Sequence, residues 1–172
     1  MKPTTALIAT FLAGISLLCN AELKSGDAGK KFKTDFADAL ELKGLAIQED
    51  GYHIWGSSPV ISDDGKIHIF CSRWSKTKPD GSPLAFDFGW RSPAAEIAHY
   101  VGDNPEGPFK FSEIVMQGSG KPTWDRRGIC NSTVRKVGDT YAIFYIANAA
   151  SGYGRGGVGS QRIGLITSKS PY

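Results

Sequence analysis

The stretch Ser58-Pro-Val-Ile-Ser-Asp-Asp-Gly-Lys-Ile-His-Ile-Phe70 has a second, similar copy later in this chain. Its second copy is Ser132-Thr-Val-Arg-Lys-Val-Gly-Asp-Thr-Tyr-Ala-Ile-Phe144, and both copies place Gly and Asp between two apolar runs. A later stretch, Glu96–Phe109, is also repeated, and its counterpart begins at Arg162 and ends at Pro171-Tyr172. A repeat of this size is a structural unit, so the strands within it decide the fold.

The alternation of apolar and polar residues inside each copy predicts antiparallel β-strands joined by short turns. Four strands are expected in the first copy, at 59–61, 66–73, 94–101 and 109–116. Three are expected in the second copy, at 130–135, 140–147 and 161–167. Four antiparallel strands with short turns are the content of one propeller blade. The predicted fold class is therefore all-β, with one four-stranded β-propeller blade and a second blade that lacks its last strand.

The chain is expected to divide into four parts. They are a signal peptide at 1–21, a leader segment at 22–51, a first blade at 52–120 and an incomplete second blade at 121–172. A short helix is also expected in the leader, at Phe36–Leu42. Because a strand pair without its partner exposes backbone groups and apolar side chains, we expect a fragment of a longer protein or completion by association.

The first residues favour export from the cell. Lys2 precedes the uncharged apolar run Ala6–Leu18, and Cys19-Asn20-Ala21 supplies small residues where a signal peptidase cleaves. A membrane anchor needs roughly 18 or more apolar residues, and this run is shorter. Leu17 and Leu18 are bulky where a lipoprotein site has small residues. We expect a secreted or periplasmic protein that has no membrane attachment after cleavage.

The composition excludes some partners and leaves the cysteines open. The net charge is only +3 and no basic block occurs, so nucleic acid is not an expected partner. Cys71 and Cys130 remain after the signal peptide, and they either form a disulfide or are two small buried hydrophobic residues. His53, His68 and His99 lack the spacing of metal ligands, so we expect neither a metal site nor a cofactor.

The order and spacing of the motifs between residues 52 and 172 are similar to those of a known family. The motifs are Pro59-Val-Ile61, the hairpin at Asp64-Gly65, Ile97–Phe109 with its Gly-Pro-Phe ending, and Arg162–Pro171. The chain resembles the five-bladed β-propeller glycoside hydrolases related to family 43 and family 117, as an N-terminal fragment of about two blades. The resemblance implies hydrolysis of glycosidic bonds in oligo- or polysaccharides, with the missing blades supplied by the rest of the protein.

The resemblance also implies where carboxylates should stand around the propeller axis. Such enzymes use a base, an acid and a third carboxylate that tunes the acid. The position of the base, before the proline of the first inner strand, is Ser58 here, and that of the third carboxylate is Asn131. The acid would come from a third blade. Because serine and asparagine are not such groups, a non-catalytic carbohydrate-binding or structural propeller is the alternative. Closure of several copies into a ring is disfavoured, because units of two blades do not make five.

Two carboxylates are the catalytic candidates. Asp125 follows Trp124 and precedes two arginines, a pattern that suits an ionised acid in a sugar pocket or, alternatively, a turn-capping Asp paired with arginine. Glu96 is the one carboxylate in an apolar strand, where an unpaired charge is costly and often functional. Its alternative is an ion pair between adjacent blades, since Arg162 occupies the matching position in the second copy. His99 lies on the opposite face from Glu96.

Aromatic and basic residues complete the expected sugar site. In a propeller of this class the loops before the inner strands face the axis, which favours Trp55 and Trp124 over Trp74 and Trp90 for stacking on sugar rings. Packing between blades is the alternative for these tryptophans. Arg73 is a candidate donor to sugar hydroxyls. The expected substrate-binding residues are therefore Trp55, Trp124, Arg73, Ser58 and Asn131.

Overall fold

A computed structural model of the chain describes residues 34–149 and 161–172. The expected signal peptide at 1–21 lies outside the described residues. By their contacts, residues 1–42 and 43–172 are two separate units. In the first, the helix α2, Asp35–Asp38, begins at Thr34, whose side chain accepts a 3.1 Å hydrogen bond from the Ala37 N–H. This helix is one turn long and starts earlier than the expected Phe36–Leu42, because the capping threonine sets its first residue.

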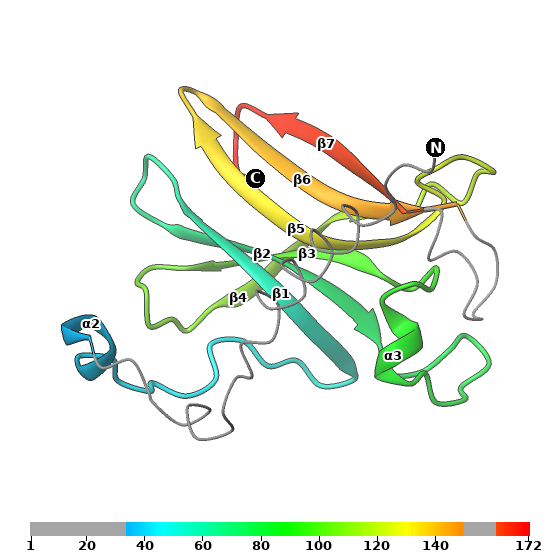
Figure 1. Cartoon of the computed structure of the whole chain (residues 1–172), viewed down its shortest axis with the longest axis horizontal. Coiled ribbons are helices and arrows are strands. Elements are labelled where there is room, and N and C mark those ends of the chain that lie inside the picture. The colour runs from blue at the N-terminus through cyan, green and yellow to red at the C-terminus, as the bar shows by residue number, and fades with distance from the viewer. Residues whose placement is uncertain (1–33, 150–160) are drawn as a thin grey trace, which may run out of the picture. The chain divides into compact units, whose positions relative to one another are not determined.

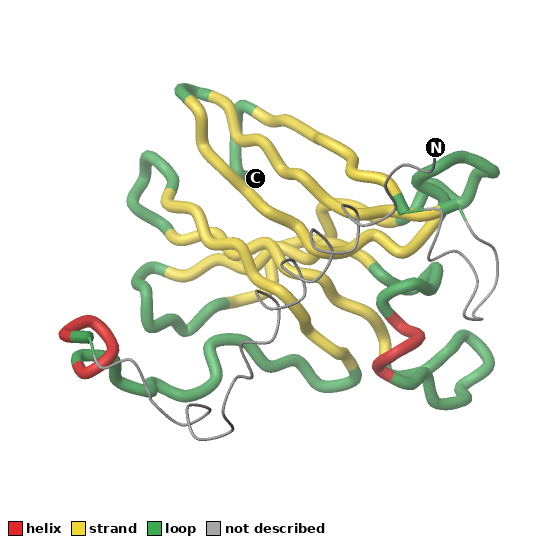
Figure 2. The backbone as a smooth tube through the Cα atoms, viewed as in Figure 1, coloured by secondary structure: helices red, strands yellow, loops and turns green. Residues whose placement is uncertain are grey.

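The second unit is built from two antiparallel sheets, and strands dominate the trace in Figure 2. The first sheet, blade 1, has the order β1-β2-β3-β4, with β1 at Tyr52–Ile61, β2 at Ile67–Ser75, β3 at Glu96–Gly102 and β4 at Lys110–Gln117. The second sheet, blade 2, has the order β5-β6-β7, with β5 at Arg127–Val137, β6 at Thr140–Asn148 and β7 at Arg162–Ser168. A one-turn helix, α3 at Phe86–Gly89, lies in the connection between β2 and β3. All seven expected strands are therefore present, and the all-β prediction is confirmed.

The two blades pack face to face through one apolar core (Figure 1). Period-two alternation puts Phe70 and Ile97 of blade 1 on the face that meets blade 2. Blade 2 contributes five buried side chains to this core, namely Ile129, Val134, Ile143, Tyr145 and Ala147. Full burial of each large apolar side chain stabilises the folded state by roughly 1.5–3 kcal/mol.

Three serine hydroxyls cross between the blades and fix the position of β5 against blade 1. The Oγ of Ser58 accepts from the Val134 N–H at 2.8 Å, and the Oγ of Ser72 accepts from the Asn131 N–H at 2.8 Å. The Oγ of Ser132 donates to the carbonyl oxygen of Phe70 at 3.1 Å. Ser58 and Ser132 occupy the same position in the two sequence copies. The same repeat position thus contributes one hydrogen bond between the blades from each blade.

The other face of blade 1 is covered by the segment at 43–51. A second cluster on this face contains Ile69, Cys71 and Tyr100, and Ile47 packs against it. Cys71 and Cys130 are free, and both are buried. The structure therefore has them as small buried hydrophobic residues and not as a disulfide. Burial raises the pKa of each thiol to about 12.

The side of blade 2 that faces away from blade 1 is uncovered in the described part of the chain. Phe144 is 46% exposed, Leu165 52% and Ile163 76%. Phe144 pairs with Leu165 across β6 and β7, so these side chains share one face. We call Phe144, Ile163 and Leu165 the open face of blade 2. In the repeat, Phe144 corresponds to Phe70, which is 2% exposed because blade 2 covers it.

Candidate functional site

The two inner strands, β1 and β5, are each interrupted by a residue with left-handed backbone. In β1 the register shifts between Trp55 and Ser57, and the residue between them, Gly56, has a φ of 59°. In β5 two residues have this backbone: Gly128, with a φ of 65°, and Asn131, with a φ of 53°, which is the one non-glycine residue with positive φ in the described ranges. Asparagine tolerates this conformation better than most residues, but such backbone is sparsely populated and clusters at functional sites.

Asn131 is the sequence-predicted residue whose setting best fits a binding role. Its side chain is exposed, while its backbone N–H is held by Ser72. The corresponding residue of the first copy is Ser57, which is also exposed and lies beside the bulge of β1. Ser57 was not predicted as a site residue from the sequence. The alignment of the two copies could have identified it, because Ser57 aligns with Asn131.

Ser58 is placed differently from Ser57 because adjacent strand residues point to opposite faces. Its side chain is 5% exposed and its Oγ holds the Val134 N–H of blade 2. The position that the resemblance assigns to a catalytic base is therefore filled by a hydroxyl that joins the two blades.

Trp55 lines a hollow beside the inner strand β1. The hollow has a volume of about 310 Å³, and Ser57 also lines it, together with Ile54 and Ile47. Trp55 is 39% exposed, and its ring packs against Trp74, with centroids 6.0 Å apart. Its other ring neighbours are Phe86 and Trp90. Trp55 therefore has the predicted packing role, through its contacts with three aromatic rings. It also keeps the exposed surface that stacking on a sugar requires.

Arg73 and Glu96 form a buried ion pair inside blade 1. They are opposite one another in the register of β2 and β3, and the distance from Arg73 Nη2 to Glu96 Oε1 is 2.6 Å. Glu49 binds the same guanidinium at 2.7 Å, and the rings of Tyr52 and Phe111 each lie 4.3 Å from it. Burial lowers the pKa of Arg73, but the bonds to Glu96 and Glu49 outweigh it and raise the pKa above its ordinary value.

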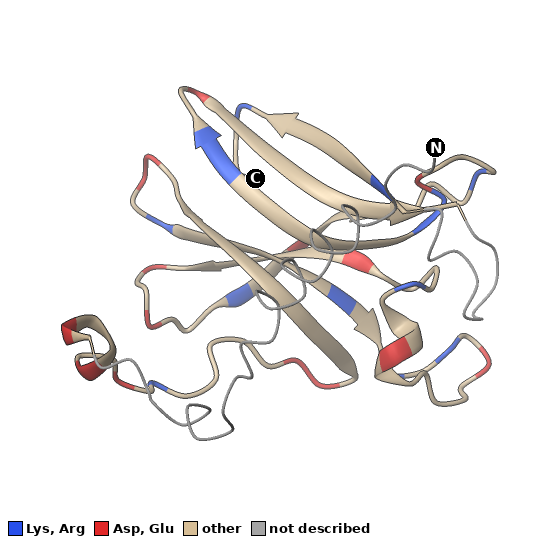
Figure 3. Cartoon of the chain, viewed as in Figure 1, with Lys and Arg blue, Asp and Glu red and all other residues tan. Residues whose placement is uncertain are grey.

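The ionic partner of Glu96 is therefore a residue of its own blade. Its second carboxylate oxygen accepts a 2.8 Å hydrogen bond from the Gln117 side chain. Arg162, which the sequence offered as a partner across blades, instead donates to the backbone of Gln161. Figure 3 shows the wider pattern, in which most acidic residues of the two sheets lie in turns and loops and few lie within strands.

Asp125 belongs to the loop that leads into β5. Its carboxylate accepts from the Thr123 hydroxyl at 2.5 Å and from the Ser119 hydroxyl at 3.0 Å. The Thr123 bond is the main cause of a lowered pKa, so Asp125 is ionised at neutral pH. Arginines were expected to stabilise this negative charge. In the structure, two hydroxyls of the same loop do so.

Trp124 stands beside Asp125 and stacks on Tyr145, with ring centroids 6.1 Å apart. A side chain at Gly164 would meet both rings at about 2.5 Å, so this glycine is needed for the stack. Trp124 is 41% exposed and leaves one face to solvent. Asp125 and Glu96 thus belong to separate networks, one in a loop of blade 2 and one inside blade 1.

Within residues 34–149 and 161–172, no group of three or more His, Cys, Asp or Glu side chains could hold a metal ion. Over the same residues, helices are too short and too polar to cross a bilayer.

Solved structures similar to this chain are glycoside hydrolases. One is a family 117 glycoside hydrolase of the marine bacterium Zobellia galactanivorans, with 17% identity over 70% of this chain and 36% of that enzyme, at a TM-score of 0.54. Another is a family 43 β-xylosidase/α-arabinofuranosidase from a compost metagenome, in complex with xylotriose, with 18% identity over 74% and 36%, at a TM-score of 0.52. A family 43 enzyme from Xanthomonas citri, complexed with xylotriose, has 14% identity over 74% and 32%, at a TM-score of 0.51.

These similarities concern the fold. The chain spans about a third of the length of each of the three enzymes. No protein-family model matches the chain, and neither does any curated protein. At such low identity, the shared feature is the arrangement of strands. The chain folds as part of a β-propeller of the kind found in glycoside hydrolases of families 43 and 117.

Proposed function

We propose that this chain forms the first two blades of a secreted five-bladed propeller that binds carbohydrate and, as a whole protein, hydrolyses glycosidic bonds. The observation that carries the proposal is the pair of left-handed bulges in the inner strands. Ser57 pairs with Cys71, and Asn131 bonds through its N–H to the next residue of β2, Ser72. The two bulges therefore lie at one level of the sheets and present two exposed polar side chains there.

Trp55 supplies the apolar part of the proposed sugar site. Trp55 is 39% exposed and is one of the residues that line a hollow of about 310 Å³, a volume at the lower end of small-molecule sites, which run from roughly 300 to 1,000 Å³. A fixed indole offers a large apolar surface to the C–H face of a sugar at low entropic cost. Xylotriose is bound by two of the similar enzymes, which makes a β-linked pentose oligosaccharide the first compound to test.

Catalysis is proposed for the whole protein. Asp125 is the carboxylate of this chain that we assign to the site, because it is ionised, partly exposed and next in sequence to the 41% exposed Trp124. Glu96, bound to Arg73 and Gln117, is assigned to holding the strand ends of blade 1. The acid would come from a later blade, in keeping with the resemblance.

The remaining blades are proposed to begin on the open face of blade 2. Phe70, Ile97 and His99 form the face by which blade 1 contacts blade 2 or lies next to it, and all are 2% exposed or less. The open face presents Phe144, Ile163 and Leu165 at the corresponding positions of the repeat. A further blade would bury these residues as blade 2 buries Phe70.

A non-catalytic carbohydrate-binding propeller is the second candidate. It is favoured by Ser58, whose hydroxyl joins the two blades where the resemblance implies a base. Both candidates share the binding site, and they differ in turnover.

The test uses the full-length protein with Asn131→Gly and Trp55→Ala. Glycine keeps the left-handed backbone at residue 131, so its variant removes only the side chain. We expect each variant to weaken binding of xylo-oligosaccharides about tenfold or more, measured by isothermal titration calorimetry. The melting temperature of Asn131→Gly should stay near the wild-type value, whereas Trp55→Ala also loses ring packing and should melt lower. Val137→Ser, on the far turn of blade 2, serves as the matched surface control, since Val137 is 69% exposed. Unchanged binding in both variants on a glycan that the wild type binds would remove these residues from the site.

Asp125→Asn separates the enzyme from the binding module. In a hydrolase that uses Asp125, turnover falls by about 10² or more while binding persists. Wild-type turnover in Asp125→Asn removes Asp125 from the reaction, and absence of turnover in the wild type on a bound glycan favours the non-catalytic candidate.

Secretion is tested by sequencing the N-terminus of the protein from its native host. Cleavage after Ala21 predicts a mature chain that begins at Glu22. An intact Met1 in the isolated protein would contradict export through this signal.

A further inference from the structure

Two buried histidines of blade 1 stand where blade 2 has apolar residues. His68 in β2 and His99 in β3 are both 0% exposed, and their rings stack with centroids 5.0 Å apart. The corresponding residues of the second copy are Ala142 in β6 and Leu165 in β7. The blade can therefore be built without imidazoles at these places, and their presence in blade 1 calls for another explanation.

The two rings belong to a row of five side chains that begins and ends with a carboxylate. Asp64 contacts the hydroxyl of Ser62, and that hydroxyl lies 2.8 Å from His68 Nε2. His68 Nδ1 lies 2.8 Å from His99 Nε2. The last link, from His99 Nδ1 to Glu113 Oε1, is 3.6 Å, which is too long for a hydrogen bond.

Counting hydrogens explains why one link is long. With both imidazoles neutral and both carboxylates ionised, the row holds three hydrogens for four links. Asp64 accepts only, so Ser62 donates to it, His68 donates through Nε2 to Ser62, and His99 donates through Nε2 to His68. His99 Nδ1 is then left with a bare lone pair, and this atom is buried without a hydrogen-bond partner. The long link is the one that lacks a hydrogen.

The groups around the rings determine their charge. Asp64 and Lys66 face His68 from the turn between β1 and β2, and Glu113 faces His99 from β4. The ring of Tyr172, after β7, contacts both imidazoles, at 4.8 Å from His68 and 6.0 Å from His99. Burial lowers the pKa of His68 against the pull of Asp64. Burial and the neighbouring His68 lower the pKa of His99 against the pull of Glu113.

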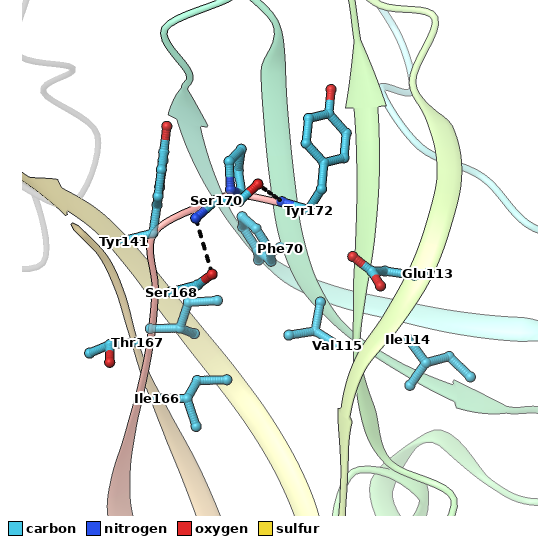
Figure 4. A pocket seen from close by; sticks show the side chains of 12 residues that line it. Phe70, Glu113, Ile114, Val115, Tyr141, Ile166, Thr167, Ser168, Ser170 and Tyr172 are labelled. Carbon is cyan, nitrogen blue, oxygen red and sulfur yellow. Dashed lines mark hydrogen bonds between the residues drawn. The ribbon is translucent and has the colours of Figure 1, made fainter. Parts of the chain in front are cut away.

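Glu113 connects the row with solvent. Figure 4 shows its carboxylate directed into the pocket between the blades, which Val115, Ile166 and Tyr172 also line. The cavity has a volume of about 230 Å³. A proton can thus approach His99 through a polar group at the edge of an otherwise apolar core.

We propose that the row Asp64–Ser62–His68–His99–Glu113 is an acid-sensitive switch that sets the stability of blade 1 and of its contact with blade 2. At neutral pH both imidazoles are uncharged, and hydrogen bonds form at three of the four contacts in the row. In mild acid a proton enters at His99 Nδ1 and closes the fourth link to Glu113. The same proton places a cation next to Phe70, whose ring stacks on His99 with centroids 4.6 Å apart, in the core between the blades.

The sign of the effect follows from which state binds more protons. Both histidines bind protons less readily when folded than the ordinary value of about 6.5 for an unfolded chain. The stabilisation is therefore complete above about pH 7.5 and is lost as the pH falls below about 6.5. Each additional proton bound on unfolding lowers the folding equilibrium constant about tenfold per pH unit.

The experiment measures urea unfolding of the full chain between pH 5 and pH 8. The variant His68→Ala with His99→Leu gives blade 1 the residues of blade 2, and we expect it to flatten the loss of stability below pH 6.5. Glu113→Gln removes the negative charge that favours the entering proton, so we expect a steeper loss. His53→Gln, at the remaining histidine of the sequence, is the matched control and should keep the wild-type slope.

A spectroscopic measurement covers the case in which the double variant does not fold. Imidazole ¹⁵N chemical shifts of the wild type at pH 7.5 should show His68 and His99 neutral, each with its hydrogen on Nε2. A charged ring or an Nδ1-protonated tautomer at that pH overturns the proposal. So does a folded double variant that keeps the acid slope.

Discussion

Blade 1 and blade 2 are built from the same repeated sequence, yet their apolar faces have different surroundings. Blade 1 is covered on one face by blade 2 and on the other by the segment at 43–51. Blade 2 is covered on one face and leaves Phe144 and Leu165 exposed on the other. Both blades thus carry an apolar face at the same repeat positions. In blade 1 that face is covered by blade 2, and in blade 2 no described residue covers it.

The largest expected effect comes from truncating the two phenylalanines at the same repeat position. Phe70→Ala should lower the free energy of unfolding by about 3–5 kcal/mol, because it leaves a cavity between the blades. Phe144→Ala should cost at most about 1 kcal/mol in this chain, because the ring is half exposed. Urea denaturation of both variants gives the difference. Repeating it in the full-length protein should raise the cost of Phe144→Ala toward that of Phe70→Ala, and equal small costs in both settings would mean that no blade covers Phe144.

The next effect tests the buried ion pair between Arg73 and Glu96 in blade 1. Arg73→Ala should cost about 3 kcal/mol, because it leaves Glu96 buried without its cation, while Gln117 still bonds the second oxygen. Arg162→Ala, at the position of blade 2 that corresponds to Glu96, should change stability by no more than about 0.5 kcal/mol. Thermal unfolding at pH 7 compares the two, and equal effects would contradict the structural role of Arg73.

A smaller effect separates Ser58 from its neighbour. Ser58→Ala should cost about 1–2 kcal/mol, because the buried Val134 N–H loses its acceptor. Ser57→Ala, one residue earlier and exposed, should leave stability unchanged. Hydrogen exchange at Val134 provides a direct measurement, since its protection should fall only in the Ser58 variant.

The smallest effect concerns the two left-handed bulges. Gly56→Ala should cost about 1 kcal/mol from backbone conformation alone, because no atom lies within 4 Å of the added methyl group. Asn131→Gly should be neutral or slightly stabilising, because glycine adopts the same φ without strain. Chemical denaturation of the two variants measures the difference, and a large cost for Asn131→Gly would show that the asparagine side chain holds the fold together.

The strands could be predicted from the sequence because their pattern is local. Alternation and turn residues identified all seven, and the repeat placed them in two blades. The predicted strand ends were less accurate. β1 begins at Tyr52 and not at residue 59, because it stays paired with β2 on both sides of the bulge at Gly56.

Side-chain partners could not be predicted, because they depend on strand register and loop geometry. Glu96 pairs with Arg73 through the alignment of β2 with β3, whereas the sequence suggested Arg162. His68 and His99 showed no ligand-like spacing, yet adjacent strands bring their rings into contact. The partners of Asp125 are hydroxyls two and six residues before it, a local arrangement that the neighbouring arginines concealed.

The segment at 43–51 has a consequence for how a ring of blades would close. Ile47 and Glu49 bind the face of blade 1 that a last blade would approach. In a closed ring this segment would lie at the contact between the first and last blades and would fill the space between them. In this chain, removal of residues up to 51 would uncover Cys71 and Tyr100 and leave Arg73 without Glu49, while leaving the core between blades 1 and 2 in place.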